Sequence, residues 1–344
     1  MRRKNFVAIF LLVFTMMLSS FAFYTYQVIY TPNVLIGEED RYFAIEKGTT
    51  FKQLQNKLDE ERIVFDLVSF SLLAKIKDLD TQIKPGMYLL KEEMSNLQLV
   101  NLLRSGRQTP VKLTFTNARK LEELSKKLSS SFAFDSTEMA TVLLNDTTAA
   151  HFGFTSDTFI GMFIPNTYEV YWTDTPLKLL ERLKKEYDNF WDANRREKAK
   201  NVGLSVQEVS TLASIVGSET NMREEMPTIA GVYLNRLKRS IPLQADPTLV
   251  FALGDFSIRR ILNRDKLLES PYNTYKYKGL PPGPIRMPSI TAIDAVLNAD
   301  QHNYLYFCAK PDFSGYHVFA STLADHNRNA RAFQRALNAE RIYR

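Results

Sequence analysis

The sequence SVQEVSTLASIVGSET, residues 205–220, predicts an amphipathic helix with a definite first turn. Ser205 and Glu208 have the spacing of a capping box, in which each side chain bonds the backbone N–H of the other. At about 100° per residue, Glu219 projects from the same side as Leu212. A carboxylate on an apolar face loses hydration when ionised, which raises its pKa toward that of a proton donor at neutral pH. We therefore predict Glu219 as a catalytic acid; the alternative is that it lies beyond the buried stretch and pairs with a basic neighbour.

The N-terminal residues predict a membrane segment. The segment from Asn5 to Gly37 contains no charged residue. As a helix with a rise of about 1.5 Å per residue, its most apolar part, Phe6 to Phe23, would nearly cross a hydrocarbon core of roughly 30 Å. Basic residues 2–4 precede it and acidic residues 38–40 follow it, which predicts a cytoplasmic N-terminus and an exported remainder. The alternative is a cleaved signal peptide, because Ser20 to Ala22 offers small residues at a suitable spacing.

Periodicity and turn residues predict an α+β chain with an N-terminal transmembrane helix and two folded regions. Residues 1–30 form a cytoplasmic tip and anchor, and 31–41 form a short polar linker. Residues 42–107, in the order strand, helix, helix, strand, helix, resemble a LysM-like glycan-binding module, with an α+β spacer as the alternative. Residues 108–344 form a larger mixed α+β catalytic domain. Its predicted elements include helices at 118–128, 136–144 and 177–196, a loop at 159–168, and a hairpin of strands 304–309 and 316–320.

Composition excludes several other classes of protein. The 44 Lys and Arg against 38 Asp and Glu give +6, but residues 2–4 supply half of that excess, which is too little to indicate nucleic-acid binding. The single cysteine, Cys308, excludes a disulfide framework and is interpreted as an inert core thiol. His317 and His326 with a carboxylate are the one metal candidate that we considered, and we predict neither a metal nor a cofactor.

Short segments of distinctive sequence follow one another over the C-terminal part of the chain: Leu212–Val216 with Glu219 and Thr220, Val232–Leu237, Leu243–Thr248, Tyr272–Tyr275, Gly279–Ile285, His317–Phe319, and His326 with Asn327. In this order they resemble the endolytic murein transglycosylases, also called the YceG-like family. The apolar N-terminal segment, the LysM-like module and the loop Phe163–Tyr168 extend the resemblance over nearly the whole chain.

The chain departs from the usual pattern of that family at two places. Gly217 stands where the family usually has a glutamate, two residues before Glu219. The loop has Ile160-Gly161 and then Pro165-Asn166-Thr167-Tyr168, where Glu-Gly and Pro-Asp-Thr-Tyr are usual. No role is expected here for those missing carboxylates, whereas Glu219 is retained.

The resemblance implies cleavage of the β-1,4 bond between N-acetylmuramic acid and N-acetylglucosamine in nascent peptidoglycan strands, which leaves 1,6-anhydro-muramoyl ends and terminates strand elongation. Ordinary glycosidases need two carboxyl groups, whereas Glu219 alone would protonate the leaving oxygen and then accept the proton of the attacking muramoyl C6 hydroxyl. We expect Glu219 at the floor of a long groove lined by Tyr272, Asn273 and Gln244. We expect four residues to bind acetamido and hydroxyl groups of the sugars: Gln244, Tyr272, Asn273 and Asn235. The alternative for each of them is a purely structural role.

The expected partners are peptidoglycan strands and peptidoglycan synthases or penicillin-binding proteins. The expected location is the cell (inner) membrane, with the catalytic domain on the extracytoplasmic side. Two other functions stay open: a non-catalytic glycan-binding or divisome scaffold, and a muramidase with Asp246 or Glu224 as a second carboxylate. The sequence Asp246-Pro247-Thr248 favours a helix N-cap for Asp246 over a catalytic base.

Overall fold

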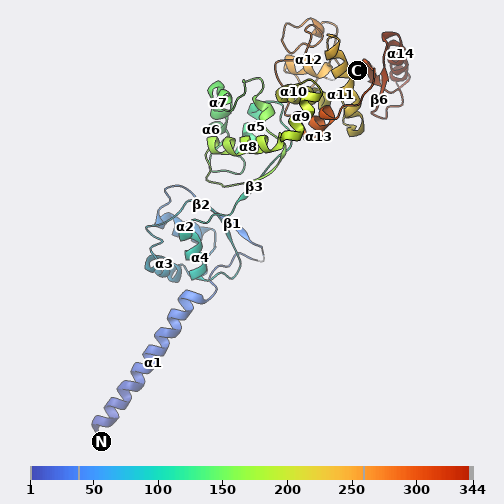
Figure 1. The fold of residues 1–344 in the computed structure, drawn as a ribbon. Coiled ribbons are helices and arrows are strands. Elements are labelled where there is room, and N and C mark those ends of the chain that lie inside the picture. Colours follow the sequence, from blue (N-terminus) through green and yellow to red (C-terminus); the bar gives the residue numbers. More distant parts are fainter. Residues whose placement is uncertain (1, 38, 259, 341–344) are drawn as a thin grey trace. The chain divides into compact units, whose positions relative to one another are not determined.

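The computed structural model describes residues 2–37, 39–258 and 260–340. Helices dominate these residues, and the predicted mixed α+β class is confirmed (Figure 1). The named strands pair two by two: β1 (Arg41–Ile45) with β2 (Gly86–Leu90), β3 (Val111–Phe115) with β4 (Asn166–Val170), and β5 (Tyr306–Ala309) with β6 (His317–Ala320).

The chain divides into two compact units. One unit holds the residues up to Lys112 together with Ser131–Ala133 and Glu169–Asp174. The other holds Leu113–Ser130, Phe134–Tyr168 and the residues from Thr175 onward. Each unit therefore has its own set of internal contacts.

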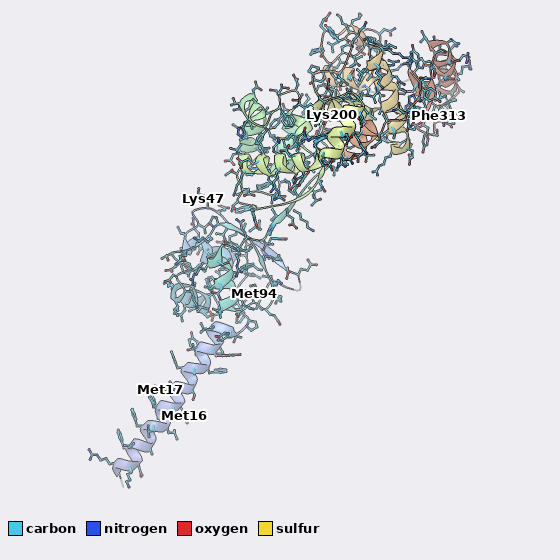
Figure 2. The ribbon with its side chains drawn as sticks, viewed as in Figure 1. Met16, Met17, Lys47, Met94, Lys200 and Phe313 are labelled. Atoms are coloured by element: carbon cyan, nitrogen blue, oxygen red, sulfur yellow. The ribbon has the colours of Figure 1, made fainter. Side chains whose placement is uncertain are left out.

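The first helix, α1 (Arg2–Tyr30), is long and apolar. Its most apolar window, within Arg3–Tyr30, has a mean hydropathy of 2.4, and none of that window is buried in the protein. Met16 and Met17 project outward from it (Figure 2). These properties are consistent with a membrane anchor. Glu38, one of the acidic residues expected to follow the anchor, lies outside the described residues.

A small module follows α1 in the first unit. Leu54 and Leu58, which the sequence places at helical spacing, are fully buried in its core. β1 and β2 pair in antiparallel register. The order of elements is the predicted one: β1, α2 (Phe51–Glu60), α3 (Leu67–Ile76), β2 and α4 (Asn96–Ser105). A LysM-like identity for this module stays a prediction.

Residues 31–36 of the predicted linker are part of this module. Val34 is fully buried and pairs with Val64 in an isolated β-bridge. The Asn96 side chain donates a hydrogen bond to the Val28 carbonyl oxygen near the end of α1, at 2.9 Å. Because apolar side chains and backbone groups both find partners here, this segment is packed rather than extended into solvent.

The second unit is organised around α10 (Val206–Glu219). The helix begins at the predicted capping box, with Ser205 and Glu208 bonded reciprocally. Residues Val209 to Val216 are all buried, which explains the apolar run in this part of the sequence. The α-helices that contact α10 include α11 (Met226–Lys238), α12 (Asp246–Leu253) and α13 (Ile290–Leu297).

The predicted helix at 177–196 is wrong in its extent. Two helices, α8 (Pro176–Phe190) and α9 (Ala193–Asn201), occupy this region because Asp192 accepts a hydrogen bond from the Arg195 backbone N–H and caps the second one. The hairpin predicted near the C-terminus is confirmed as β5 and β6. The remaining helices of the second unit are α5 (Leu121–Ser129), α6 (Ser136–Leu143), α7 (Asp146–His151) and α14 (Leu323–Ala339).

The predicted loop at 159–168 contains regular structure. A 3-10 turn, η1 (Phe159–Met162), comes first, and the start of β4 follows it and pairs with β3. The physical reason is that β4 needs a strand partner distant in the sequence, which local turn signals do not reveal.

Candidate active site

Glu219 is the last residue of α10 and lines a cavity of about 480 Å³ in the second unit. We call this the Glu219 cavity. Its walls come from α11, the first turn of α12, the hairpin β5–β6 and α14. Polar side chains that line it include Tyr233, Arg236, Gln244, Asp246, Tyr275 and His317.

The Glu219 carboxyl group has a strongly perturbed pKa. Burial raises its pKa from the ordinary 4.5 to about 7, and the nearby charge of Asp246 acts in the same direction. The Tyr233 hydroxyl donates a hydrogen bond to Oε1 of Glu219 at 2.5 Å, and this bond and the charge of Arg236 partly oppose the rise. Both the protonated and the ionised form are therefore accessible near neutral pH, so the group can both give and take a proton.

Tyr233 holds the Glu219 carboxyl from α11. Its ring is fully buried, and burial together with Glu219 raises the pKa of Tyr233 well above its ordinary value. Its hydroxyl therefore remains a donor at neutral pH. The Phe307 ring meets the Tyr233 ring edge to face at 5.8 Å, which restricts the direction of that donor.

Asp246 lies in the same cavity as Glu219. The interpretation of Asp246 as an N-cap is wrong: Ala245 occupies the cap position, and Asp246 is the first residue of α12. The Tyr275 hydroxyl donates a hydrogen bond to Oδ1 of Asp246 at 2.5 Å. Burial and this bond raise the pKa of Tyr275, so Tyr275 stays a donor to the carboxylate.

The sequence did not predict the contact between buried Glu225 and partly buried His317 near the cavity. The backbone N–H of His317 donates to Oε1 of Glu225 at 2.8 Å, and Nδ1 of His317 lies 3.0 Å from Oε2. Glu225 is buried, and His317 lines the Glu219 cavity. Glu224, which we considered as a second carboxylate, is exposed and does not line this cavity.

The four predicted substrate-binding residues occupy different places. Gln244 lines the Glu219 cavity, with a left-handed backbone at φ 53°. Asn273 is fully buried, and its amide donates to the carbonyls of Lys266 and Leu268. Tyr272 and Asn273, which we expected to line the groove at Glu219, do not line the Glu219 cavity, and Asn235 does not line it either. Direct substrate contacts by these three residues stay predictions.

The contacts of Asn235 and Tyr272 explain where they lie. The Asn235 amide donates to the His302 carbonyl at 2.7 Å and to the Tyr304 carbonyl at 3.1 Å. Its side chain therefore ties α11 to the segment that leads into β5. Tyr272 lines a second cavity of the same unit, together with Phe251.

Gly217 lies where α10 packs against α13. A Cβ atom at this position would lie 3.2 Å from Cβ of Ala292, closer than ordinary contact. A side chain at this position would therefore meet α13. The chain has no carboxylate at this point that could assist Glu219.

Cys308 and the two neighbouring histidines carry no metal signature. Within residues 2–37, 39–258 and 260–340, no three His, Cys, Asp or Glu residues are grouped as a metal site. Cys308, His317 and His326 all line the Glu219 cavity. Burial raises the pKa of the Cys308 thiol, which disfavours the reactive thiolate.

Comparison with known proteins decides the family. The sequence model described as the YceG-like family matches residues 43–332, most of the chain. This chain belongs to the YceG-like family. The YceG-like protein is 38% identical over 169 residues to a protein of Bacillus subtilis named endolytic murein transglycosylase. It is 29% identical over 366 residues to a protein of the same name from Streptococcus pneumoniae.

Both relatives are longer than the segment that aligns with this chain. The Bacillus match covers 49% of the YceG-like protein and 46% of its relative, and the Streptococcus match covers 95% and 64%. The chain therefore spans less than two thirds of the length of either relative. A crystal structure of a YceG-like protein from Listeria monocytogenes has a TM-score of 0.56 and 25% identity, and the match covers 85% of this chain and 99% of that one.

Proposed function

We propose that this protein is an endolytic lytic transglycosylase that cleaves the β-1,4 bond between N-acetylmuramic acid and N-acetylglucosamine in nascent peptidoglycan strands. The observation that carries the proposal is the Glu219 carboxyl, with a pKa of about 7, in a cavity of about 480 Å³. The names of the Bacillus and Streptococcus relatives support the same activity.

The mechanism assigns both proton transfers to Glu219. Protonated Glu219 gives its proton to the glycosidic oxygen as the bond from that oxygen to the muramoyl anomeric carbon breaks. The resulting carboxylate then accepts the proton of the muramoyl C6 hydroxyl, whose oxygen forms the new bond to the anomeric carbon. Glu219 ends protonated again, and no water is consumed. The hydrogen bond from Tyr233 keeps the carboxyl in place through both steps.

Asp246 supports a second candidate, a muramidase with two carboxylates. It lines the cavity of Glu219 and accepts its hydrogen bond from Tyr275. In that reaction Asp246 would act as nucleophile or would activate water, and the product would carry a reducing end. We favour the transglycosylase because the Bacillus and Streptococcus relatives are named endolytic murein transglycosylase, and because Glu219 alone can make both proton transfers of that reaction.

Product analysis tests the proposal against both alternatives. Sacculi are incubated with this chain in detergent, and the released fragments are analysed by mass. We expect anhydro-muramoyl ends from wild type and, within about tenfold of its rate, from Asp246→Asn. Reducing ends that disappear in Asp246→Asn would instead favour the muramidase. Absence of any cleavage by wild type would favour the non-catalytic scaffold.

The pH dependence of cleavage should report the pKa of Glu219. We expect the rate to fall as the pH rises through about 7, because the proton donor is then lost. Tyr233→Phe removes the hydrogen bond that lowers this pKa, so the alkaline limb should move to higher pH. Rates measured from pH 5 to 9 check this, with Tyr277→Phe, an exposed tyrosine outside the Glu219 cavity, as control. An identical limb in wild type and Tyr233→Phe would contradict the assignment.

The remaining parts of the chain fit the same proposal. α1 would anchor the protein in the cell membrane with its N-terminus in the cytoplasm, and the residues after α1 would then lie on the side of the peptidoglycan. The small module would bind glycan as a LysM-like module. Peptidoglycan synthases are the partners that would supply the strands whose elongation this protein ends.

A further inference from the structure

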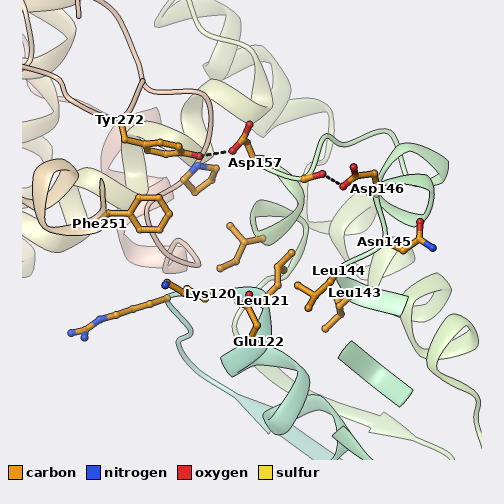
Figure 3. A pocket seen from close by; sticks show the side chains of 15 residues that line it. Lys120, Leu121, Glu122, Leu143, Leu144, Asn145, Asp146, Asp157, Phe251 and Tyr272 are labelled. Atoms are coloured by element: carbon orange, nitrogen blue, oxygen red, sulfur yellow. Dashed lines mark hydrogen bonds between the residues drawn. The ribbon is translucent and has the colours of Figure 1, made fainter. Parts of the chain in front are cut away.

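A second cavity of about 350 Å³ lies in the same unit as Glu219. Figure 3 shows Phe251 and Tyr272 on one side of it and Leu144, Asn145 and Asp146 on the other. Its volume is within the range of roughly 300–1,000 Å³ that is usual for small-molecule sites. Nothing in the mechanism above uses these residues.

The chemistry of the second cavity suits a sugar ring. The rings of Phe251 and Tyr272 are partly exposed and lie 4.8 Å apart, and they offer flat apolar surface. The Tyr272 hydroxyl donates to Oδ1 of Asp157 at 3.1 Å, and the Asp157 carboxylate is exposed at the rim. Sugar hydroxyls can donate to this carboxylate while a carbon-rich sugar face covers the rings.

Two segments of the chain connect the second cavity to the Glu219 cavity. α12 supplies Asp246 to the Glu219 cavity and Phe251 to the second one. The loop after Ser270 supplies Tyr275 to the Glu219 cavity and Tyr272 to the second one. Positions 246 and 251 are about 7.5 Å apart along the helix axis, at 1.5 Å per residue. The two cavities therefore share two segments of the chain in their walls.

We propose that the second cavity is a remote subsite, which holds one sugar residue of the glycan strand away from the bond broken at Glu219. This inference rests on the proposed function, which supplies the glycan strand as the substrate. A remote subsite uses binding energy from a non-reacting part of the strand to place the scissile bond. Longer strands should consequently bind more tightly than short ones.

Direct binding of a peptide-free sugar chain tests the subsite. The probe is a β-1,4-linked N-acetylglucosamine tetramer. It is titrated into the whole chain in detergent, and the chain carries Glu219→Gln so that binding is measured without cleavage. We expect Tyr272→Leu on this background to weaken binding about tenfold, because the aromatic surface is lost. Tyr272→Phe keeps the ring and should keep most of the affinity. Tyr277→Leu, at an exposed tyrosine outside both cavities, serves as the matched control.

A second variant covers the case in which Tyr272→Leu fails to fold. Asp157→Ala removes an exposed carboxylate and should weaken binding severalfold with an unchanged melting temperature. Wild-type affinity in both Tyr272→Leu and Asp157→Ala would overturn the inference. Binding of free stem peptide that depends on Tyr272, without binding of the tetramer, would also overturn it.

The outcomes separate this inference from the proposed function. If wild type cleaves sacculi but tetramer binding is independent of Tyr272, the subsite fails and the proposed function stands. If wild type cleaves nothing while Tyr272-dependent binding persists, the second cavity is a sugar site and the proposed function fails.

Discussion

The Glu219→Gln variant is expected to cleave glycan strands about 10³-fold more slowly than wild type. Glutamine has nearly the same shape and still accepts the hydrogen bond that Tyr233 donates to Oε1. It has no acidic proton for the leaving oxygen and no carboxylate to accept the C6 hydroxyl proton. Both steps assigned to Glu219 are lost together. The rate of release of anhydro-muramoyl fragments from sacculi measures the effect.

Glu208→Gln is the matched control for this substitution. Glu208 is at the other end of α10, where its side chain accepts the Ser205 backbone N–H of the capping box. Glutamine also serves in a capping box, so this variant should fold and cleave like wild type. Cleavage by Glu219→Gln at a tenth of the wild-type rate or more would contradict the role of Glu219 as the proton donor.

The stability of the Glu219→Gln variant provides a second measurement, which does not depend on activity. The pKa of Glu219 is about 7 in the folded protein and near 4.5 when unfolded, so the folded state binds more protons between these values. Wild type should therefore lose stability as the pH rises from 4.5 through 7, by up to roughly 3 kcal/mol. Glu219→Gln should lack this loss. Its advantage in stability over wild type should consequently be larger at pH 8 than at pH 5.

Arg236→Ala is expected to destabilise the second unit by about 3–5 kcal/mol. The Arg236 side chain is buried, and Nε donates to the Leu305 carbonyl at 2.6 Å. One terminal nitrogen donates to the carbonyls of Pro242 and Leu243 at 3.0 and 2.9 Å. In the alanine variant these three carbonyl oxygens would lose their charged hydrogen-bond donor while they remain shielded from water. The free energy of opening, measured by hydrogen exchange in α10 and α11, should fall accordingly.

Arg239→Ala provides the control for that prediction. Arg239 follows α11, is exposed, and should change stability by less than about 0.5 kcal/mol. Arg236→Lys should recover only part of the loss, because an ammonium group cannot reproduce the planar guanidinium geometry. Equal opening free energies in Arg236→Ala and Arg239→Ala would show that the buried hydrogen bonds contribute nothing net.

Prediction from sequence worked best for features that depend on near neighbours. The capping box at Ser205 joins residues three apart, and both partners are visible in the local sequence. The helix period places Glu219 on the same side as the buried residues. In the structure, burial raises the pKa of Glu219, which is the predicted direction. The hairpin near the C-terminus likewise follows from two strands with a turn between them.

Prediction failed where a side chain had both a local and a distant partner available. Asp246 is followed by Pro and Thr, which is a cap signal, yet its carboxylate bonds the Tyr275 hydroxyl. Asp192 was not recognised as a cap, so two helices were predicted as one. Residues 31–36 looked like a polar linker, yet Val34 is fully buried. For Asp246 and residues 31–36, packing in three dimensions selected between states of similar local free energy. The Asp192 cap is instead a local signal, because its partner Arg195 is only three residues away.

The sequence alone determined the apolar N-terminal segment, the α+β class, the capped helix and the position of Glu219 on it, because these follow from periodicity over a few turns. Only the tertiary structure decided which groups surround Glu219. Glu225 and His317 are 92 residues apart and bond each other beside the cavity. Asp246 and Tyr275 enter the cavity from different segments. Such pairs form when distant elements pack together, and no local spacing in the sequence specifies them.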